Sequence, residues 1–253
     1  MEALVAALDA AFGAAELVVL HAATSALGPL EGGVDAFVSA LREARRERTL
    51  IVPTFTMHRA DPPSGPELAP GADPRTPAGM GRWVERLLPF LDARSSHPTE
   101  SVGALGPHAS IVMPHPVDEP MGPRSPWARL VERDARIVLL GVGLERCSLL
   151  HHAERMAEVP YLDGSAYLVP VEMDGEPSWI EVVGNRCSEG FPRLLPRLAP
   201  ETVRVLGAGA TIVGARNLFD VARAALRENP RALLCSSCLA CMVARDDIAQ
   251  ARR

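Results

Sequence analysis

The strongest constraint on the fold is a pair of short apolar runs separated by an amphipathic segment. Residues 15–22, AELVVLHA, are rich in Val and Leu and bounded by polar residues, a pattern typical of a buried strand. In residues 34–48 the apolar side chains recur at helical spacing, with Arg and Glu on the other face. A second buried strand follows in residues 49–56, TLIVPTFT, and ends at Pro53, which cannot donate a ladder hydrogen bond. This order predicts a parallel pair of strands joined by a right-handed crossover.

The remainder of the chain continues this α/β pattern. The strongest buried strand is predicted over residues 135–143, ARIVLLGVG, and the helix before it begins with Ser125 as N-cap and Pro126 at its first position. Further helices are predicted at 83–91, 149–157 and 217–226, and further strand-like runs at 166–173, 178–183 and 203–214. With 253 residues, 47% of them hydrophobic, and no internal repeat, the chain is expected to form one domain over residues 1–253.

Residues 57–81 interrupt this pattern. The segment is dense in Pro, Gly and Asp and shows no hydrophobic period. A plain connector rarely exceeds about 12 to 15 residues, and longer loops in a compact domain are more often functional. We therefore expect residues 57–81 to form a surface loop on the substrate side of a site.

Charge and aromatic content argue against several classes of partner. Lys and Arg number 26 against 31 Asp and Glu, a formal net charge of -5, and only 4% of residues are aromatic. We expect no nucleic-acid partner, because neither phosphate neutralisation nor base stacking is well served. No apolar run approaches the roughly 20 residues that cross a bilayer, and the N-terminal stretch carries acids where a secretory signal carries Lys or Arg. We therefore expect a cytoplasmic protein with no membrane partner, and a homodimer stays open.

Five cysteines are spread unevenly along the chain. Cys235, Cys238 and Cys241 crowd into CSSCLACM, whereas Cys147 and Cys187 lie far away in sequence. A closed zinc site needs four ligands, so three neighbouring thiols fall short and we expect no metal. The interpretation that we favour over a metal site is a group of small buried thiols near a helical C-terminus, in a reducing compartment.

The turn after the first predicted strand is one candidate binding site. Thr24, Ser25 and several backbone N–H groups precede the helix that begins near Gly32, which makes a plausible phosphate cradle. The segment matches neither G-x-G-x-x-G nor a Walker loop, so an ordinary strand-to-helix turn is the alternative interpretation.

A histidine and a glutamate on one predicted helix are the candidate catalytic groups. His151 and Glu154 lie three residues apart, so they share a helix face, and the carboxylate can hold one imidazole nitrogen while the other acts as a base. His152 points roughly 100 degrees away. The alternatives are a solvated ion pair or a satisfied core histidine. We find no further ligands nearby at metal-binding spacing.

The polar stretch RSSHPTESVGALGPHA, residues 94–109, is a third candidate. Its Ser and Thr hydroxyls, with turns predicted at Pro98, Gly103 and Gly106, could bind the amides of a pantetheine arm or hold a developing oxyanion. The alternative is a tight turn whose side chains satisfy its own backbone. No G-x-S-x-G elbow surrounds these serines, which counts against a hydrolase.

Five segments follow one another in an order typical of one family. They are VVLHAATSALGPLEGGVDAFVSAL, TLIVPTFT, GMGRWVERLLPFLDARSSHPTESVGALGPHA, SPWARLVERDARIVLLGVGLERCSLLHHAE and VGARNLFDVARAAL. Together, over residues 17–226, they resemble the aminoglycoside 3-N-acetyltransferases, also called the antibiotic acetyltransferases.

This resemblance implies a single-domain α/β fold, a mixed sheet flanked by helices, unlike the GNAT acetyltransferase fold. It implies acetyl-CoA as co-substrate and acetyl transfer to an amine. We further expect direct transfer to a small-molecule amine, with no metal. The family's catalytic histidine and glutamate fall on His151 and Glu154. The residues that the resemblance assigns to coenzyme binding are Thr24, Ser25, Ala26, Leu27, Arg94, Ser95, His97 and Ser101.

Two departures from the family concern the site. Cys147 and Ser148 stand where the family often has Asn-Thr, which puts a thiol near the site. The loop after the second strand is shorter than in many members and has no Trp or Tyr, so the acceptor could be smaller than an aminoglycoside or be held by other walls of the site. The residues that we expect to contact the acceptor are Thr56, Asp61, Glu67 and Asp73.

Three alternative functions stay open from the sequence. The same fold could acylate a different amine in natural-product biosynthesis. A hydrolase could use Cys147 or a serine as a covalent nucleophile. A non-catalytic binding protein could use the same scaffold, since fold does not fix function.

Overall fold

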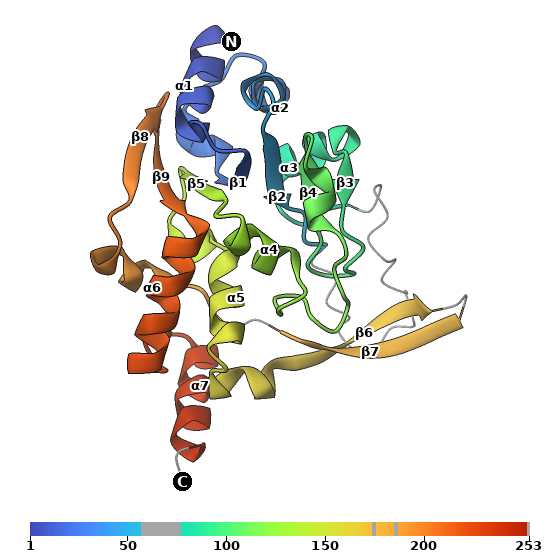
Figure 1. Ribbon diagram of the computed structural model, residues 1–253, viewed down its shortest axis with the longest axis vertical. Coiled ribbons are helices and arrows are strands. Elements are labelled where there is room, and N and C mark those ends of the chain that lie inside the picture. The colour runs from blue at the N-terminus through green and yellow to red at the C-terminus, as the bar shows by residue number, and fades with distance from the viewer. Residues whose placement is uncertain (57–76, 174–175, 185–186, 252–253) are drawn as a thin grey trace.

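A mixed seven-stranded sheet forms the centre of the computed structural model, which describes residues 1–56, 77–173, 176–184 and 187–251 (Figure 1). The strand order is β3-β4-β2-β1-β5-β9-β8. The strands are β1 (Leu17–Ala22), β2 (Thr49–Pro53), β3 (Ala93–Arg94), β4 (Val102–Leu105), β5 (Arg136–Leu140), β8 (Glu201–Val205) and β9 (Ala208–Gly214). This architecture confirms the predicted α/β class with a mixed sheet.

Only the middle of the sheet is parallel. Strand β1 pairs in parallel with β2 on one side and β5 on the other, and the remaining pairs are antiparallel. The predicted parallel pair is thus confirmed. Because three neighbouring strands run the same way, their carboxyl ends meet at one edge of the sheet, where α/β proteins place their ligands.

Helices cover both faces of the sheet. Alternate side chains of β1 enter two different cores: Leu17 and Val19 lie in one, Val18 and Leu20 in the other. The first core is completed by α4 (Pro126–Glu132), α5 (Leu149–Met156) and α6 (Ala215–Glu228), and the second by α1 (Glu2–Phe12), α2 (Gly33–Ala44) and α3 (Arg82–Leu87). Burial on both faces explains why these strands read as continuous apolar runs.

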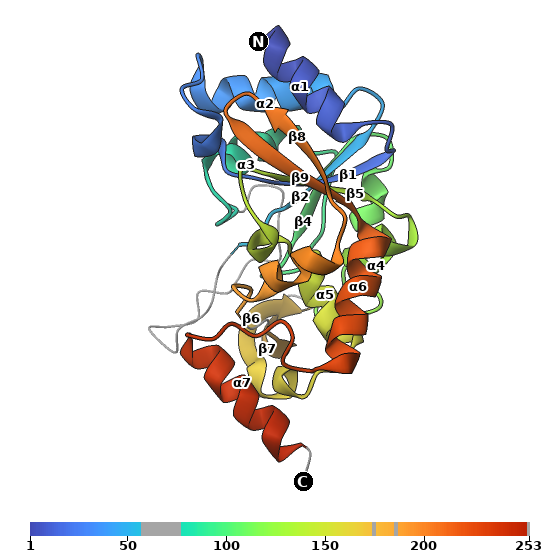
Figure 2. The same ribbon diagram turned by 90° about the vertical axis from the view of Figure 1, so that its left-hand side faces the viewer.

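A second, two-stranded sheet lies apart from the main sheet. Strands β6 (Ala166–Met173) and β7 (Glu176–Val183) form an antiparallel hairpin that projects from the body (Figure 1). Below the main sheet, α7 (Leu239–Gln250) leads to the C-terminus and contacts the 3₁₀ segment η5 (Pro160–Ser165) (Figure 2). Within the described ranges, none of the helices has both the length and the apolar character that a bilayer crossing requires.

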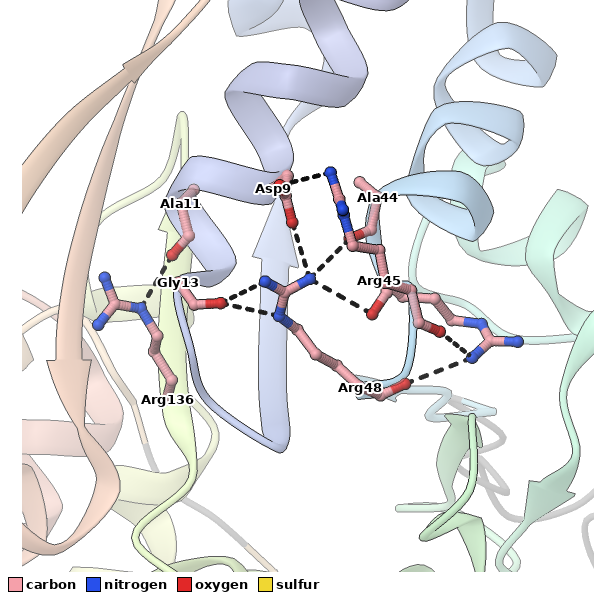
Figure 3. A network of polar contacts seen from close by, with 8 residues as sticks. Asp9, Ala11, Gly13, Ala44, Arg45, Arg48 and Arg136 are labelled. Atoms are coloured by element: carbon pink, nitrogen blue, oxygen red, sulfur yellow. Dashed lines mark hydrogen bonds and ion pairs between the residues drawn. The ribbon is translucent and has the colours of Figure 1, made fainter.

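Helix α1 was not predicted, and a polar network ties it to the sheet (Figure 3). Arg48, just before β2, donates from Nε to the carbonyl oxygen of Gly13 over 2.9 Å and from Nη1 to Asp9 Oδ1 over 2.8 Å. Arg136, at the start of β5, donates from Nε to the carbonyl oxygen of Ala11 over 2.9 Å. Two arginines at strand starts therefore satisfy carbonyls at the C-terminal end of α1.

Three local predictions have different outcomes. The prediction of a turn at Gly103 was wrong, because this residue lies within β4. A Cβ at this position would come within 2.5 Å of Leu91 Cδ1, so close packing explains the glycine. The turn at Gly106 is confirmed, with a φ of +138°. Ser125 occupies the N-cap position of α4 as predicted, but its hydroxyl donates to the carbonyl oxygen of Gly122 over 2.7 Å instead of accepting from the helix.

Candidate active site

A cavity of about 590 Å³ opens at the carboxyl ends of the central strands. Its walls come from the end of β1, the residues after β2, the start of α3, the loop after β5 and the first turns of α5. The described lining includes Leu20, His21, Ala22, Ala23, Pro53, Phe55, Trp83, Thr99, Glu100, Glu145, Cys147, Ser148, His151 and Ser188. This is the position in which an α/β sheet is expected to hold a ligand.

The two candidate catalytic residues contact each other on α5. His151 Nδ1 lies 2.8 Å from Glu154 Oε2. The Glu154 side chain is 0% exposed and the His151 side chain 12% exposed, so the carboxylate is internal while the imidazole reaches the cavity. Since Glu154 holds Nδ1, Nε2 is the ring nitrogen left for a ligand.

Two aromatic residues fix this pair. Tyr161, in η5, donates its hydroxyl to Glu154 Oε1 over 2.6 Å, so both oxygens of the buried carboxylate are engaged. The ring of Phe191 meets the His151 ring edge to face, with centroids 4.9 Å apart. Burial and the neighbouring Glu154 raise the pKa of Tyr161, which stays a hydrogen-bond donor. The arrangement orients an imidazole as a general base requires.

The neighbouring histidine has a structural role. His152 is buried, its Nδ1 donates to the carbonyl oxygen of Met121 over 2.7 Å, and its ring stacks on Phe219 at 5.2 Å. Burial lowers its pKa, which keeps the ring neutral. The core histidine of this helix is therefore His152, whereas His151, for which the sequence left a core position open, lines the cavity.

The polar stretch from Arg94 is anchored by contacts within the protein. Arg94 ends β3, and its buried guanidinium donates to Thr54 Oγ1, to the Thr54 carbonyl and to Ser101 Oγ over 2.8–3.2 Å. The Ser101 hydroxyl in turn donates to the Thr54 carbonyl over 2.7 Å. These bonds tie the segment to the residues after β2.

Two neutral histidines complete this anchoring. His97 Nδ1 accepts from the backbone N–H of Glu100 over 3.0 Å, and its Nε2 donates to the Val117 carbonyl. Ser95 Oγ lies 2.9 Å from His115 Nδ1. Burial lowers the pKa of His97 to about 3 and that of His115 to about 4. The contacts favour the tight-turn interpretation for these side chains.

The segment nevertheless reaches the cavity. Thr99 and Glu100 line it, whereas Arg94, Ser95, His97 and Ser101 are absent from the described lining. The four side chains assigned to coenzyme binding therefore shape a wall whose cavity-facing residues are their neighbours.

The turn after β1, also predicted to bind the coenzyme, comes directly after cavity-lining residues in the chain. Thr24, Ser25, Ala26 and Leu27 form the 3₁₀ segment η1, immediately after the lining residues Ala22 and Ala23. Gly141, with a φ of +65°, lies so close that a Cβ there would come within 2.4 Å of Ala26 Cβ. Only glycine permits this approach of the β5 end to the turn.

The predicted acceptor residues are described only in part. Thr56 is buried, its hydroxyl donates to the Pro98 carbonyl, and its N–H donates to the Thr99 carbonyl over 3.0 Å. Asp61, Glu67 and Asp73 lie within residues 57–76, outside the described residues, so their role stays a prediction.

The sequence interpretation missed several cavity residues. His21, near the end of β1, lines the cavity, is buried, and its Nε2 has no hydrogen-bond partner among the described residues. Burial lowers its pKa to about 4. Trp83 also lines the cavity and donates from Nε1 to the Ala22 carbonyl over 3.0 Å. For His21 the available sequence signal was a polar residue within an apolar strand. No sequence signal pointed to Tyr161, which supports Glu154 from outside the described lining.

The thiol beside the site is poorly suited to nucleophilic catalysis. Cys147 lines the cavity but is buried, and this burial raises its pKa to about 12. The thiolate is the nucleophilic form of cysteine, so a thiol held protonated at neutral pH is unreactive. This counts against a hydrolase that uses Cys147.

Comparison with known proteins gives one consistent result. Residues 19–227 match the family model described as aminoglycoside 3-N-acetyltransferase. The chain is 37% identical over 208 residues to aminoglycoside N(3)-acetyltransferase VIII of Streptomyces fradiae, covering 76% of this chain and 72% of that one.

Solved structures agree with this result. A mutant of the aminoglycoside acetyltransferase AAC(3)-IVa in complex with a gentamicin superposes with a TM-score of 0.80 at 27% identity, over 97% of this chain and 96% of that one. AAC-IIIb in binary complex with CoASH superposes with a TM-score of 0.71 at 26% identity, over 89% and 95%.

Proposed function

The chain belongs to the aminoglycoside 3-N-acetyltransferase family of acyltransferases, and we propose on this basis that it acetylates an aminoglycoside. The proposed donor is acetyl-CoA, and the proposed acceptor nitrogen is the 3-amino group. The observation that carries the catalytic part of the proposal is His151, which lines the cavity while the buried Glu154 holds its Nδ1.

The general base is needed because an ammonium ion has no lone pair. His151 Nε2 takes a proton from the acceptor amine as the nitrogen attacks the thioester carbonyl. A nitrogen–carbon bond forms, the carbon–sulfur bond breaks, and the imidazolium gives its proton to the departing coenzyme thiolate, which returns His151 to its neutral form. The buried Glu154 carboxylate stabilises the imidazolium that forms, and such a base typically contributes about 10²- to 10⁴-fold in rate.

The coenzyme is proposed to lie along two neighbouring walls. One is the turn Thr24–Leu27 after β1, and the other is the segment from Arg94 to Ser101. In this proposal Arg94, Ser95, His97 and Ser101 act by holding the backbone of the second wall, and the pantetheine arm meets the residues that face the cavity.

The acceptor is proposed to enter beside the end of β2. Among the described lining residues, the carboxylates of Glu100 and Glu145 outnumber the one guanidinium, that of Arg146. The segment that follows β2 adds Thr56 and the predicted acceptor residues Asp61, Glu67 and Asp73. Carboxylates around a concave site raise the local concentration of a polycationic ligand. A substrate carrying several ammonium groups fits this charge.

The test is thiol release from acetyl-CoA with gentamicin, other aminoglycosides and simple alkyl amines as acceptors. We expect aminoglycoside-dependent release and a product that NMR shows to be acetylated at the 3-amino group. His151→Gln is the matched variant, because it keeps much of the side-chain volume and removes the base.

Other outcomes would identify an alternative. Turnover only with a different amine would favour a biosynthetic acetyltransferase. Thiol release that needs no amine, with an acetyl adduct on Cys147 in the intact mass, would favour a hydrolase. Thiol release that stays at background with every acceptor would contradict the proposal for aminoglycosides.

A further inference from the structure

Four of the five cysteines come together between the end of β7 and the start of α7. Cys187 follows β7, Cys235 and Cys238 precede α7, and Cys241 lies in its first turn. Their four sulfur atoms all lie within 4.8 Å of one another. We infer that these four thiolates bind one structural Zn²⁺ ion, and this inference does not depend on the proposed function.

The spacing of the sulfurs fits a single tetrahedral ion. A zinc–sulfur bond is about 2.3 Å, so two sulfurs on one tetrahedral zinc lie about 3.8 Å apart. Cys187 Sγ and Cys235 Sγ are 3.7 Å apart. A disulfide requires about 2.05 Å. The four cysteine sulfurs of an iron–sulfur cluster are divided between two or four irons, so they cannot all lie as close together as four sulfurs on one ion.

Backbone N–H groups point at every sulfur of the cluster. Glu189 N donates to Cys187 Sγ, Cys238 N to Cys235 Sγ, Cys241 N to Cys238 Sγ, and Cys235 N to Cys241 Sγ, over 3.3–3.4 Å. Such bonds stabilise thiolate over thiol and orient the ligands of a metal. Metal binding releases the thiol protons to solvent.

The two segments that carry the ligands are built to touch. A Cβ on Gly190 would come within 2.1 Å of the Leu233 carbonyl oxygen, so glycine is required where the backbones cross. Arg245 donates to the carbonyl oxygens of Cys241 and Cys235, and Arg193 donates to that of Leu234. These guanidinium groups offset the net charge of about −2 that four thiolates and Zn²⁺ carry together.

The sequence argument against a metal counted three ligands. Its premise was that Cys187 is remote, and in the fold this residue supplies the fourth sulfur. Four protein ligands leave no open coordination position, which is the pattern of structural rather than catalytic zinc.

The position of the cluster gives the ion a consequence for the active site. Ser188, next to Cys187, lines the cavity, and Phe191, four residues along, packs on the His151 ring. Helix α7, which begins at the cluster, contacts η5, which carries Tyr161. The ion would therefore hold the segment of Ser188 and Phe191 close to α7, which packs on the segment of Tyr161. In this way it would help to position the proposed base, His151.

The first test is the metal content of the full chain purified with a reductant and without a metal-affinity tag. We expect about one zinc per chain by elemental mass spectrometry. Release of zinc should follow titration of the thiols with a mercurial, monitored with a colorimetric chelator. This measurement on the wild-type chain avoids any failure of a variant to fold.

Variants locate the ion. Cys187→Ser, Cys235→Ser, Cys238→Ser and Cys241→Ser should each lower zinc retention at least about tenfold against a competing chelator, whereas Cys147→Ser, outside the cluster, should keep it. The cobalt-loaded wild type should show the intense visible bands and sulfur-to-metal charge transfer of a tetrahedral thiolate site.

Three results would overturn the inference. They are wild-type protein that contains no zinc and takes up none after reduction, an octahedral cobalt spectrum, or zinc retained by all four variants. Iron in place of zinc, in a mononuclear tetrathiolate site, would overturn the assignment of the ion as zinc. Hydrogen exchange on chelation should rise around residues 187–191 and along α7; unchanged exchange there would remove the positioning role.

Discussion

The segment 94–101 and the start of α5 are two polar walls of the same cavity, and they use their polar groups in opposite ways. In the first, Arg94, Ser95 and His97 bond to protein atoms and hold a fold in place. In the second, the buried Glu154 engages one nitrogen of His151 and leaves the other at the cavity.

The difference shows that the number of polar residues in a segment is a weaker guide to function than hydrogen-bonding capacity left unused. A buried polar group must be satisfied, and a segment rich in hydroxyls and imidazoles can satisfy itself. A catalytic group must keep one site open toward the ligand. The following predictions test this contrast.

The largest effect is expected at His151. His151→Gln should lower kcat by about 10²- to 10⁴-fold and leave coenzyme binding nearly intact, because an amide cannot accept the proton. Steady-state kinetics with calorimetric titration of CoA measure both quantities.

The matched control is its neighbour. His152→Asn keeps an N–H near the Met121 carbonyl, so kcat per folded molecule should persist while the free energy of unfolding falls. Equal kcat for the two variants would contradict the assignment of the base.

Arg94→Met tests the opposite wall. The substitution removes the donors to the Thr54 carbonyl and to the hydroxyls of Thr54 and Ser101, so the free energy of unfolding should fall by about 2–4 kcal/mol. Urea denaturation measures this change. Unchanged stability with a KM for acetyl-CoA raised about tenfold would mean that Arg94 binds the coenzyme directly.

The stability of the same wall should depend on pH. His97 and His115 stay neutral when folded, with pKa values of about 3 and about 4, whereas in the unfolded chain they titrate near 6.5. Unfolding therefore takes up protons below about pH 6.5, and stability falls as pH falls. Between about pH 7 and pH 5.5, each histidine should lower the free energy of unfolding by about 1 kcal/mol.

Urea midpoints across this pH range measure the effect. His97→Asn, whose amide oxygen can accept from Glu100 N, should flatten the dependence by the share of one histidine. A wild-type curve that stays level down to about pH 5 would mean that these rings are not held neutral.

The smallest effect is expected at Tyr161. Tyr161→Phe removes one hydrogen bond to the Glu154 carboxylate, so kcat should fall about three- to tenfold, which is part of the free energy of one bond to a charged group. The KM for acetyl-CoA should not change, because Tyr161 acts through Glu154. A change confined to KM would instead place Tyr161 at the coenzyme.

What could be predicted followed from contiguous patterns. The apolar runs of β1, β2 and β5 indicated the parallel centre, and the spacing of His151 and Glu154 indicated their contact on one helix face. Helix α1 carried a usable signal in Leu4, Leu8, Ala11 and Phe12, which recur at helical spacing and are buried.

What could not be predicted depends on contacts between distant segments. Strands β3 and β4 are two and four residues long, and their segment is joined to the end of β2 partly through buried polar side chains, which leaves no period to detect. The support of Glu154 by Tyr161, across the turn after α5, and the approach of Cys187 to the C-terminal cysteines have the same origin.

The place of Trp83 gives the enzyme a built-in optical reporter. Its indole lines the cavity and meets the Phe37 ring edge-on at 5.7 Å, while Trp127 is wholly interior and Trp179 is 56% exposed. Only one of the three fluorophores therefore stands where an arriving ligand displaces solvent. Occupancy of the cavity should alter one component of the intrinsic emission, which makes affinities measurable without a label.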